Sequence, residues 1–336
     1  MFNKLRYPII QAPMAGGIST VCLAKAISSS GGLGFLAAGY KTVEALEHEI
    51  LEMQQGNDLF GVNLFVPQTD AVNEKELYAF MTVLQQDVGR ELGKPMYSND
   101  EWEGKLALVK KYKVPVVSFT FGCPDKVLIE QLQVIGTYVI VTVTTVQEAK
   151  LAVSQGANAI CLQGYEAGGH QASFENTDIE NPLPLVELLQ QVKEKVHIPI
   201  IVAGGIMDGK KIQQLLAEGA DAVQLGTAFI CCDESGANEV YRQALQSGEF
   251  ASTKLTRAFT GRLARGLEND FIKKYSTIAP KAYPALHYVT QPIRKNAIAE
   301  KNAQVMSLWA GIGYQQIRAL PTKELFELLV KEAGLE

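Results

Sequence analysis

One histidine ends a glycine-rich loop whose residue types suit proton transfer. The sequence QGYEAGGH at residues 163–170 ends in His170, directly after Gly168 and Gly169. A neutral imidazole near pH 7 is a suitable base for a carbon-bound proton, and the glycines permit close approach of the main chain to a ligand. We therefore predict that His170 is catalytic, with Glu166 in the same loop as the competing base.

Two further loops have the composition of a phosphate-binding site. The sequences AGGI at residues 203–206 and QLGT at residues 224–227 each follow a short apolar run. Glycines leave main-chain N–H groups open to an anion, and in a barrel the loops after the last two strands often share a phosphate site. These loops favour a phosphate site over a tight turn alone, and the phosphate can belong to a substrate or a cofactor.

Two amides and a methionine add contacts suited to a planar ring. Asn63 and Gln163 lie at the ends of apolar runs, and each offers a donor and an acceptor, as the mixed edge of a flavin requires. For either amide, a satisfied polar residue at the barrel mouth is the equal alternative. Met14 follows Pro13 and is either a soft apolar ring contact or a core residue.

Other classes of function find little support. The sequence has no GxSxG, P-loop or HExxH motif, and its five cysteines have no metal-ligand spacing, so we expect no metal site. The net charge of −5 and the absence of a long basic run argue against nucleic-acid binding. No apolar stretch reaches about 18 residues, so we expect no membrane span.

Eight short apolar runs must position these residues. They alternate with amphipathic segments, and most are apolar throughout, as parallel strands covered on both faces are. This predicts an α/β fold, a (β/α)₈ TIM barrel, with an open doubly wound sheet as the alternative. The runs are residues 7–11, 33–37, 60–65, 114–119, 138–143, 159–163, 198–203 and 222–225.

The chain of 336 residues is longer than a bare barrel, which needs roughly 250. Residues 233–306 follow the eighth run, are more polar, and read as a smaller helical cap domain inserted after strand 8. Residues 1–232 and 307–336 then form the barrel. The segment 69–102, with helical periodicity, reads as an enlarged crossover.

The order and spacing of the motifs resemble the nitronate monooxygenase family, formerly called 2-nitropropane dioxygenases. The motifs are QAPMAGG at 11–17, SFTFGCP at 118–124, QGYEAGGH, AGGI and QLGT, and GRLARGLEN at 261–269 is similar to the family's cap-region motif. The match extends over nearly the whole chain.

The resemblance implies a barrel that binds flavin mononucleotide (FMN) and a catalytic base at His170. It places FMN contacts on the amides and the glycine loops described above. The full set of candidate cofactor-binding residues is Ala12, Pro13, Met14, Asn63, Gln163, Gly168, Gly169, Gly204, Gly205, Gln224, Leu225, Gly226 and Thr227.

The resemblance also implies an activity, the FMN-dependent oxidation of alkyl nitronates by O₂ to a carbonyl compound and nitrite, with nitroalkanes as a second candidate substrate class. A flavin-dependent NAD(P)H enoyl-acyl-carrier-protein reductase is the alternative, because such reductases share the glycine loops. We expect Met14, Phe119 and Phe121 to exclude water around the flavin ring. A cytoplasmic enzyme is expected, with the nitronate and O₂ as partners, and a homodimer is left open.

Overall fold

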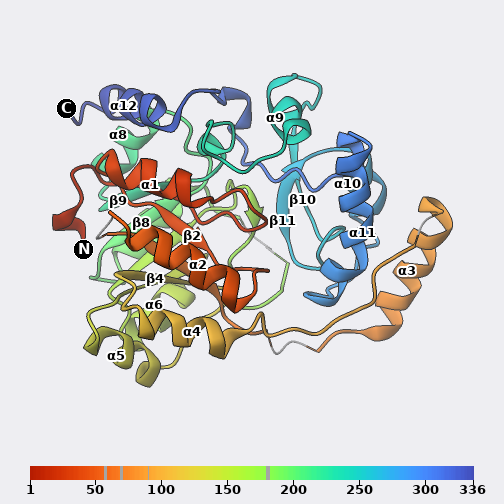
Figure 1. Cartoon of the computed structure of the whole chain (residues 1–336), viewed down its shortest axis with the longest axis horizontal. Helices are drawn as coiled ribbons and strands as arrows, with labels where there is room; N and C mark the ends of the chain where they lie inside the picture. Colours follow the sequence, from red (N-terminus) through yellow and green to blue (C-terminus); the bar gives the residue numbers. More distant parts are fainter. Residues whose placement is uncertain (57–58, 69–70, 90, 179–181) are drawn as a thin grey trace.

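A closed barrel of eight parallel strands forms the larger part of the molecule (Figure 1). The computed structural model describes residues 1–56, 59–68, 71–89, 91–178 and 182–336. The strands pair in the order β1-β9-β8-β6-β5-β4-β3-β2, and a parallel bridge between Ile10 and Leu33 joins β1 to the start of β2. Their bounds are Ile9–Gln11 (β1), Phe35–Ala37 (β2), Gly61–Phe65 (β3), Val116–Thr120 (β4), Tyr138–Val143 (β5), Ala159–Gln163 (β6), Ile200–Ala203 (β8) and Ala222–Leu225 (β9).

The predicted (β/α)₈ TIM barrel is therefore confirmed, and each of the eight predicted runs overlaps one barrel strand, with β4 extending one residue beyond its run to Thr120. The Gln11 side chain supports the closure, because its Oε1 accepts a hydrogen bond from the main-chain N–H of Phe35 at 2.9 Å. This bond ties the first strand to the second across the seam.

Helices cover the outside of the barrel and begin at side-chain caps where the sequence provides them. The side chains of Thr42, Thr145 and Asp208 each accept a hydrogen bond from the first turn of the following helix. The surrounding helices are α1 (Val21–Ser29), α2 (Val43–Gln54), α4 (Trp102–Lys111), α5 (Lys126–Val134), α6 (Val146–Ser154), α7 (Leu185–Lys193), α8 (Gly209–Ala217) and α12 (Thr322–Glu332).

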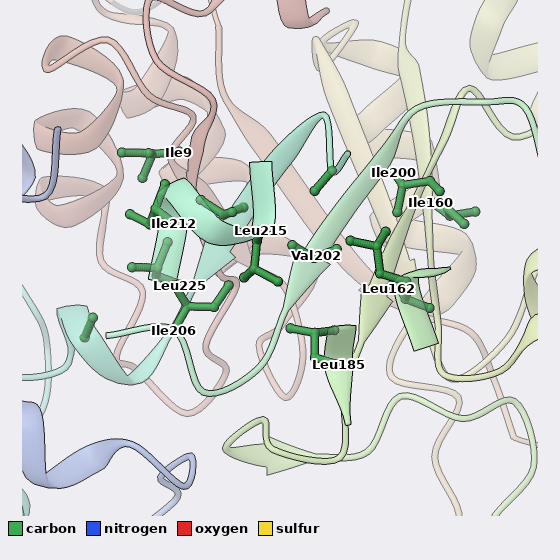
Figure 2. Packing of buried hydrophobic residues seen from close by; sticks show 14 of the residues in the cluster. Ile9, Ile160, Leu162, Leu185, Ile200, Val202, Ile206, Ile212, Leu215 and Leu225 are labelled. Carbon is green, nitrogen blue, oxygen red and sulfur yellow. The ribbon is translucent and has the colours of Figure 1, made fainter. Parts of the chain in front are cut away.

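The layer between strands and helices is apolar because both faces of each strand are covered. Ile160 and Leu162 of β6, Val202 of β8 and Leu225 of β9 are buried, and Figure 2 shows them packed with Leu215 of α8 and its neighbours. Burying one such side chain contributes about 1.5–3 kcal/mol. A second buried cluster, including Phe35, Val116 and Ile201, is covered by Phe2 and Leu5 near the N-terminus.

A second lobe stands beside the barrel, to the right in Figure 1. It contains α9 (Glu239–Gln246), α10 (Asp270–Tyr275) and α11 (Ala285–Ala299), and it also has two antiparallel strands that the sequence did not predict, β10 (Thr253–Thr256) and β11 (Ala264–Leu267). The two-residue strand β7 (Gly169–His170) pairs with β11, with His170 opposite Ala264.

The long crossover after β3 also contributes to this lobe. Its helix α3 (Glu74–Val88) buries Leu77, Phe80 and Leu84 in one cluster with residues of α10 and α11, among them Phe271. The lobe thus includes α3 and β7 as well as the inserted segment, and the division at residues 233–306 stays a prediction. Among the described residues, no helix is both long enough and apolar enough to cross a bilayer.

Candidate active site

A cavity of about 180 Å³ lies at the C-terminal ends of the barrel strands. The predicted base His170 and every predicted cofactor-binding residue line it. These are Ala12, Pro13, Met14, Asn63, Gln163, Gly168, Gly169, His170, Gly204, Gly205, Gln224, Leu225, Gly226 and Thr227. Tyr40, Phe121 and Trp309 complete the enclosure.

The loops after β8 and β9 present bare main chain to this cavity. Gly204 and Gly205 have φ values of +128° and +64°, a region that side chains disfavour. Within the described residues, no protein atom accepts a hydrogen bond from the N–H groups of Gly204, Gly205 or Gly226. Unpaired donors in glycine loops fit the phosphate of a cofactor, because an anion can accept from several of them at once.

Two other predicted contact residues, Gly168 and Thr227, also pack against or bind the C-terminal segment of the chain. A Cβ atom on Gly168 would lie 2.5 Å from the main-chain nitrogen of Gly311, so the glycine permits close packing of the C-terminal segment on this loop. The Thr227 hydroxyl accepts a hydrogen bond from that same Gly311 N–H at 3.0 Å. Both residues therefore hold residues 309–311 against the cavity.

The two predicted amides are hydrogen-bonded within the protein, Asn63 to the neighbouring strand β4 and Gln163 to the loop after β6. Asn63 Nδ2 donates to the hydroxyls of Ser118 and Thr120, each at 2.9 Å. Gln163 Nε2 donates to the His170 carbonyl at 3.1 Å, and its Oε1 accepts from Ala172 N–H at 2.8 Å. Gln163 therefore fixes the main chain on both sides of residue 171 and helps to place His170.

His170 lies between the barrel and the second lobe, with hydrogen bonds to each. Its Nε2 is 2.9 Å from the hydroxyl oxygen of Thr260. The rings of Phe121, Tyr283 and Trp309 surround the imidazole with centroids 5.7, 5.8 and 5.7 Å away. This aromatic enclosure restricts the ring, and His170 lines the cavity.

Burial and two nearby arginines keep His170 neutral. Burial, with smaller contributions from Arg262 and Arg294, lowers the pKa of His170 from its usual value near 6.5 to about 3. The Arg262 guanidinium stacks on Phe121, its central carbon 4.2 Å from the ring centre. Arg294 donates to the His287 carbonyl at 2.7 Å. Among the described residues that line the cavity, none is acidic.

The structure corrects two expectations about the cavity. Glu166 does not line it; instead Glu166 Oε1 accepts the Leu185 N–H at 2.8 Å and caps α7, whose own N-cap residue is a proline. Phe119 is fully buried and packs against Trp102 of α4. Side chains alternate along a strand, so Thr120 lines the cavity while Phe119 points to the helix layer.

Several residues of the site were not predicted. Tyr40 has a φ of +66°, its N–H donates to Asp100 Oδ1 at 2.9 Å, and its ring stacks on His287 with centroids 4.1 Å apart. Its hydroxyl lies 3.2 Å from that of Tyr283. Burial raises the pKa of Tyr40 to about 12, so the phenol remains a hydrogen-bond donor. Only the motif at 261–269 offered a sequence signal near Thr260 and Arg262.

A larger, more open hollow of about 1070 Å³ lies beside α6 and α7. Its described lining residues include Gln163, Gln171 and Glu148, with no histidine or cysteine among them. The residues that carry chemistry gather in the smaller cavity.

Known proteins place this arrangement in a family. The family model described as nitronate monooxygenase matches residues 1–332. The nitronate monooxygenase of Pseudomonas aeruginosa is 37% identical to the chain, with 98% of this chain and 96% of that protein covered.

Solved structures are also similar to the chain. A nitroalkane oxidase from Streptomyces ansochromogenes is 44% identical, covers 99% of this chain and 97% of its own, and superposes with a TM-score of 0.95. FabK from Thermotoga maritima is 27% identical, covers 99% of this chain and 94% of its own, and has a TM-score of 0.77.

Proposed function

The chain belongs to the nitronate monooxygenase family, and from that premise we propose that it oxidises alkyl nitronates with O₂ to a carbonyl compound and nitrite, using bound FMN. The proposal rests on one observation above all. His170, kept neutral, faces the same cavity as the unpaired N–H groups of Gly204, Gly205 and Gly226.

FMN is the form of flavin that the cavity suits. The three unpaired glycine N–H groups would hold its phosphate, and Met14 and Ala12 would lie beside it on the neighbouring loop, close to Gly226. When bound, FMN supplies the redox chemistry that passes electrons from the nitronate to O₂. Tyr40, Phe121 and Trp309 would exclude water from the reacting centre.

Arg262 and Arg294 suit the site to an anionic substrate. Their charge lowers the pKa of His170, and the same charge would favour a bound nitronate over its neutral nitroalkane. When a nitroalkane enters, His170 would accept its α-proton, and the nitronate formed would offset the new charge on the imidazole. The two arginines therefore disfavour a protonated His170 in the free enzyme without preventing proton transfer to it.

The nitronate and O₂ are the small-molecule partners of this proposal. We place the enzyme in the cytoplasm, because its five cysteines are all free thiols, as expected in a reducing compartment. A homodimer stays a prediction.

The test is anaerobic reduction of the flavin in the purified protein. We expect a yellow protein whose flavin is bleached by propionate-3-nitronate and not by NADPH, with acid-released flavin identified as FMN by chromatography. Bleaching by NADPH alone would instead favour the enoyl reductase, an activity disfavoured by the lower similarity to FabK. A Gly226→Val variant serves as the matched control, because its weaker FMN binding should lower the flavin content and, in proportion, the bleaching.

A further inference from the structure

The partner of the His170 ring comes from a turn far away in the sequence. Thr260 is 2% exposed, and its hydroxyl oxygen lies 2.9 Å from His170 Nε2 across 90 residues of chain. The main-chain N–H groups of Thr260 and Gly261 both donate to the Arg257 carbonyl. Gly261 has a φ of +80°, and a Cβ there would lie 2.5 Å from the Ala282 carbonyl carbon, so the turn is closely packed.

The hydrogen bonds around the Thr260 hydroxyl bear on which ring nitrogen carries the proton. A hydroxyl has one hydrogen to donate and two lone pairs that accept. Thr260 Oγ1 donates to the Arg262 carbonyl at 3.2 Å and accepts from the Arg262 N–H at 3.4 Å. With the hydroxyl hydrogen directed to the Arg262 carbonyl, the remaining lone pair would accept from His170 Nε2–H. This arrangement uses all three capacities of the hydroxyl and leaves Nδ1 of His170 with a lone pair.

We propose that Thr260 is a positioning residue that holds His170 as its Nε2–H tautomer and makes Nδ1 the nitrogen that accepts the substrate proton. This inference rests on the proposed function, because it assigns atoms to the proton transfer. The C–H bond of a nitroalkane breaks, its electron pair stays on the substrate as the nitronate, and a new N–H bond forms at Nδ1. No other hydrogen bond of the His170 ring is found within the described residues.

Other groups around the ring support a fixed, neutral imidazole. Phe121 and Trp309 confine it, and Gln163 holds its carbonyl through Nε2. None of these contacts distinguishes the two neutral tautomers, since none reaches a ring nitrogen. Among the described residues only the Thr260 hydroxyl reaches a ring nitrogen, so its loss should change the tautomer without removing the ring from the cavity.

The experiment compares the flavin-loaded wild-type enzyme with Thr260→Ser and Thr260→Val. Serine keeps the hydroxyl, and valine keeps the shape without it. We expect kcat/KM for nitroethane to fall about 100-fold in Thr260→Val and less than about 3-fold in Thr260→Ser. Oxidation of ethyl nitronate, which arrives already ionised, should fall much less in both. Thr137→Val, which removes an equally buried hydroxyl bonded to the Val114 carbonyl, controls for general destabilisation.

A second readout separates this proposal from the proposed function. In protein labelled with ¹⁵N at its four histidines, two-bond proton–nitrogen correlations identify the protonated ring nitrogen of His170. We expect Nε2–H in the wild type and in Thr260→Ser, and its loss in Thr260→Val. An Nδ1–H tautomer in the wild type, or equal nitroethane rates in the two variants, overturns the proposal. If Thr260→Val fails to fold, the spectra of the wild type and Thr260→Ser decide. An enzyme inactive on nitronates that still shows Nε2–H contradicts the proposed function and leaves the tautomer assignment standing.

Discussion

The two sides of the active-site cavity are built in different ways. The glycine side consists of Gly204, Gly205 and Gly226, and it offers main-chain donors from two adjacent loops of the barrel. The lobe side consists of His170 and Thr260 with the nearby Arg262, and it offers side chains that meet only through tertiary contacts. The difference indicates that one side holds the cofactor and the other manages the substrate proton, so each can be disabled separately.

The largest expected effect comes from removing the base on the lobe side. His170→Ala should lower kcat/KM for nitroethane by about 10²–10⁴-fold, because general-base catalysis contributes that much. Oxidation of ethyl nitronate should fall far less, and flavin content should stay at the wild-type level. Steady-state O₂ consumption and the flavin absorbance measure both. His48→Ala, on an exposed face of α2, is the control; equal losses on both substrates would remove the base role of His170.

The next effect is on stability, through a buried ion pair that holds the Tyr40 loop. Lys105 Nζ lies 2.9 Å from Asp100 Oδ2, the lysine is 1% exposed, and Asp100 Oδ1 accepts the Tyr40 N–H. Lys105→Met leaves that carboxylate without its cation, and we expect the free energy of unfolding to fall by about 3 kcal/mol.

Urea denaturation measures this change against a surface control. Lys126→Met removes an exposed partner of Glu130 at 3.8 Å and should cost less than about 0.5 kcal/mol. If both variants lose the same small amount, the buried pair does not support the Tyr40 loop.

A smaller effect should appear on the glycine side alone. In Gly226→Val the new Cβ would lie 3.4 Å from Ala12 and fill space at the cavity wall, so the Kd of FMN should rise about 10-fold or more with little loss of stability. Fluorescence titration of the apoprotein with FMN measures this. Gly136→Val gives the opposite pattern, because Gly136 is exposed with a φ of +91°, so stability falls while FMN affinity is kept. Loss of FMN affinity in both variants would contradict the separation of the two sides.

The smallest effect concerns acid stability. Burial and the Arg294 charge lower the pKa of His287 to about 2, below its value near 6.5 in the unfolded chain. Above pH 6.5 the two states bind equal protons at this site. Below it the unfolded chain binds one more, so the free energy of unfolding falls by about 1.4 kcal/mol per pH unit.

His287→Gln removes this term, and denaturant melts between pH 6.5 and pH 5 should show a shallower slope than the wild type. His48→Gln should leave the slope unchanged. A wild-type slope in His287→Gln would mean that the histidine is protonated in the folded protein despite Arg294.

The barrel and the glycine side could be predicted from sequence because both depend on local residue types. Runs rich in Val, Ile and Phe marked each of the eight strands, and glycines directly after β8 and β9 marked the loops that line the cavity. A glycine with positive φ leaves a signal at its own position, so no distant contact had to be known.

The lobe side could not be predicted in the same way. Strands β7 and β11 contain Gly, Arg and His and lack the apolar pattern of a strand. They are strands because they pair with each other, and that contact is not visible in either local sequence. Arg294 stands beside Lys295 in a short basic pair that is typical of a solvated surface, and the fold brings its charge near His170. Glu166 shared a loop with His170, yet its carboxylate caps α7.

The pairing of His170 in β7 with Ala264 in β11 limits how lobes can be exchanged between related enzymes. Because His170 pairs with Ala264, a lobe transplanted from another protein would bring its own version of the strand that aligns the base. A chimaera could therefore retain its flavin and its colour while its histidine sits in the wrong register. Donor lobes for such grafts should be chosen by the geometry of the His170–Ala264 pair before their substrate range is considered.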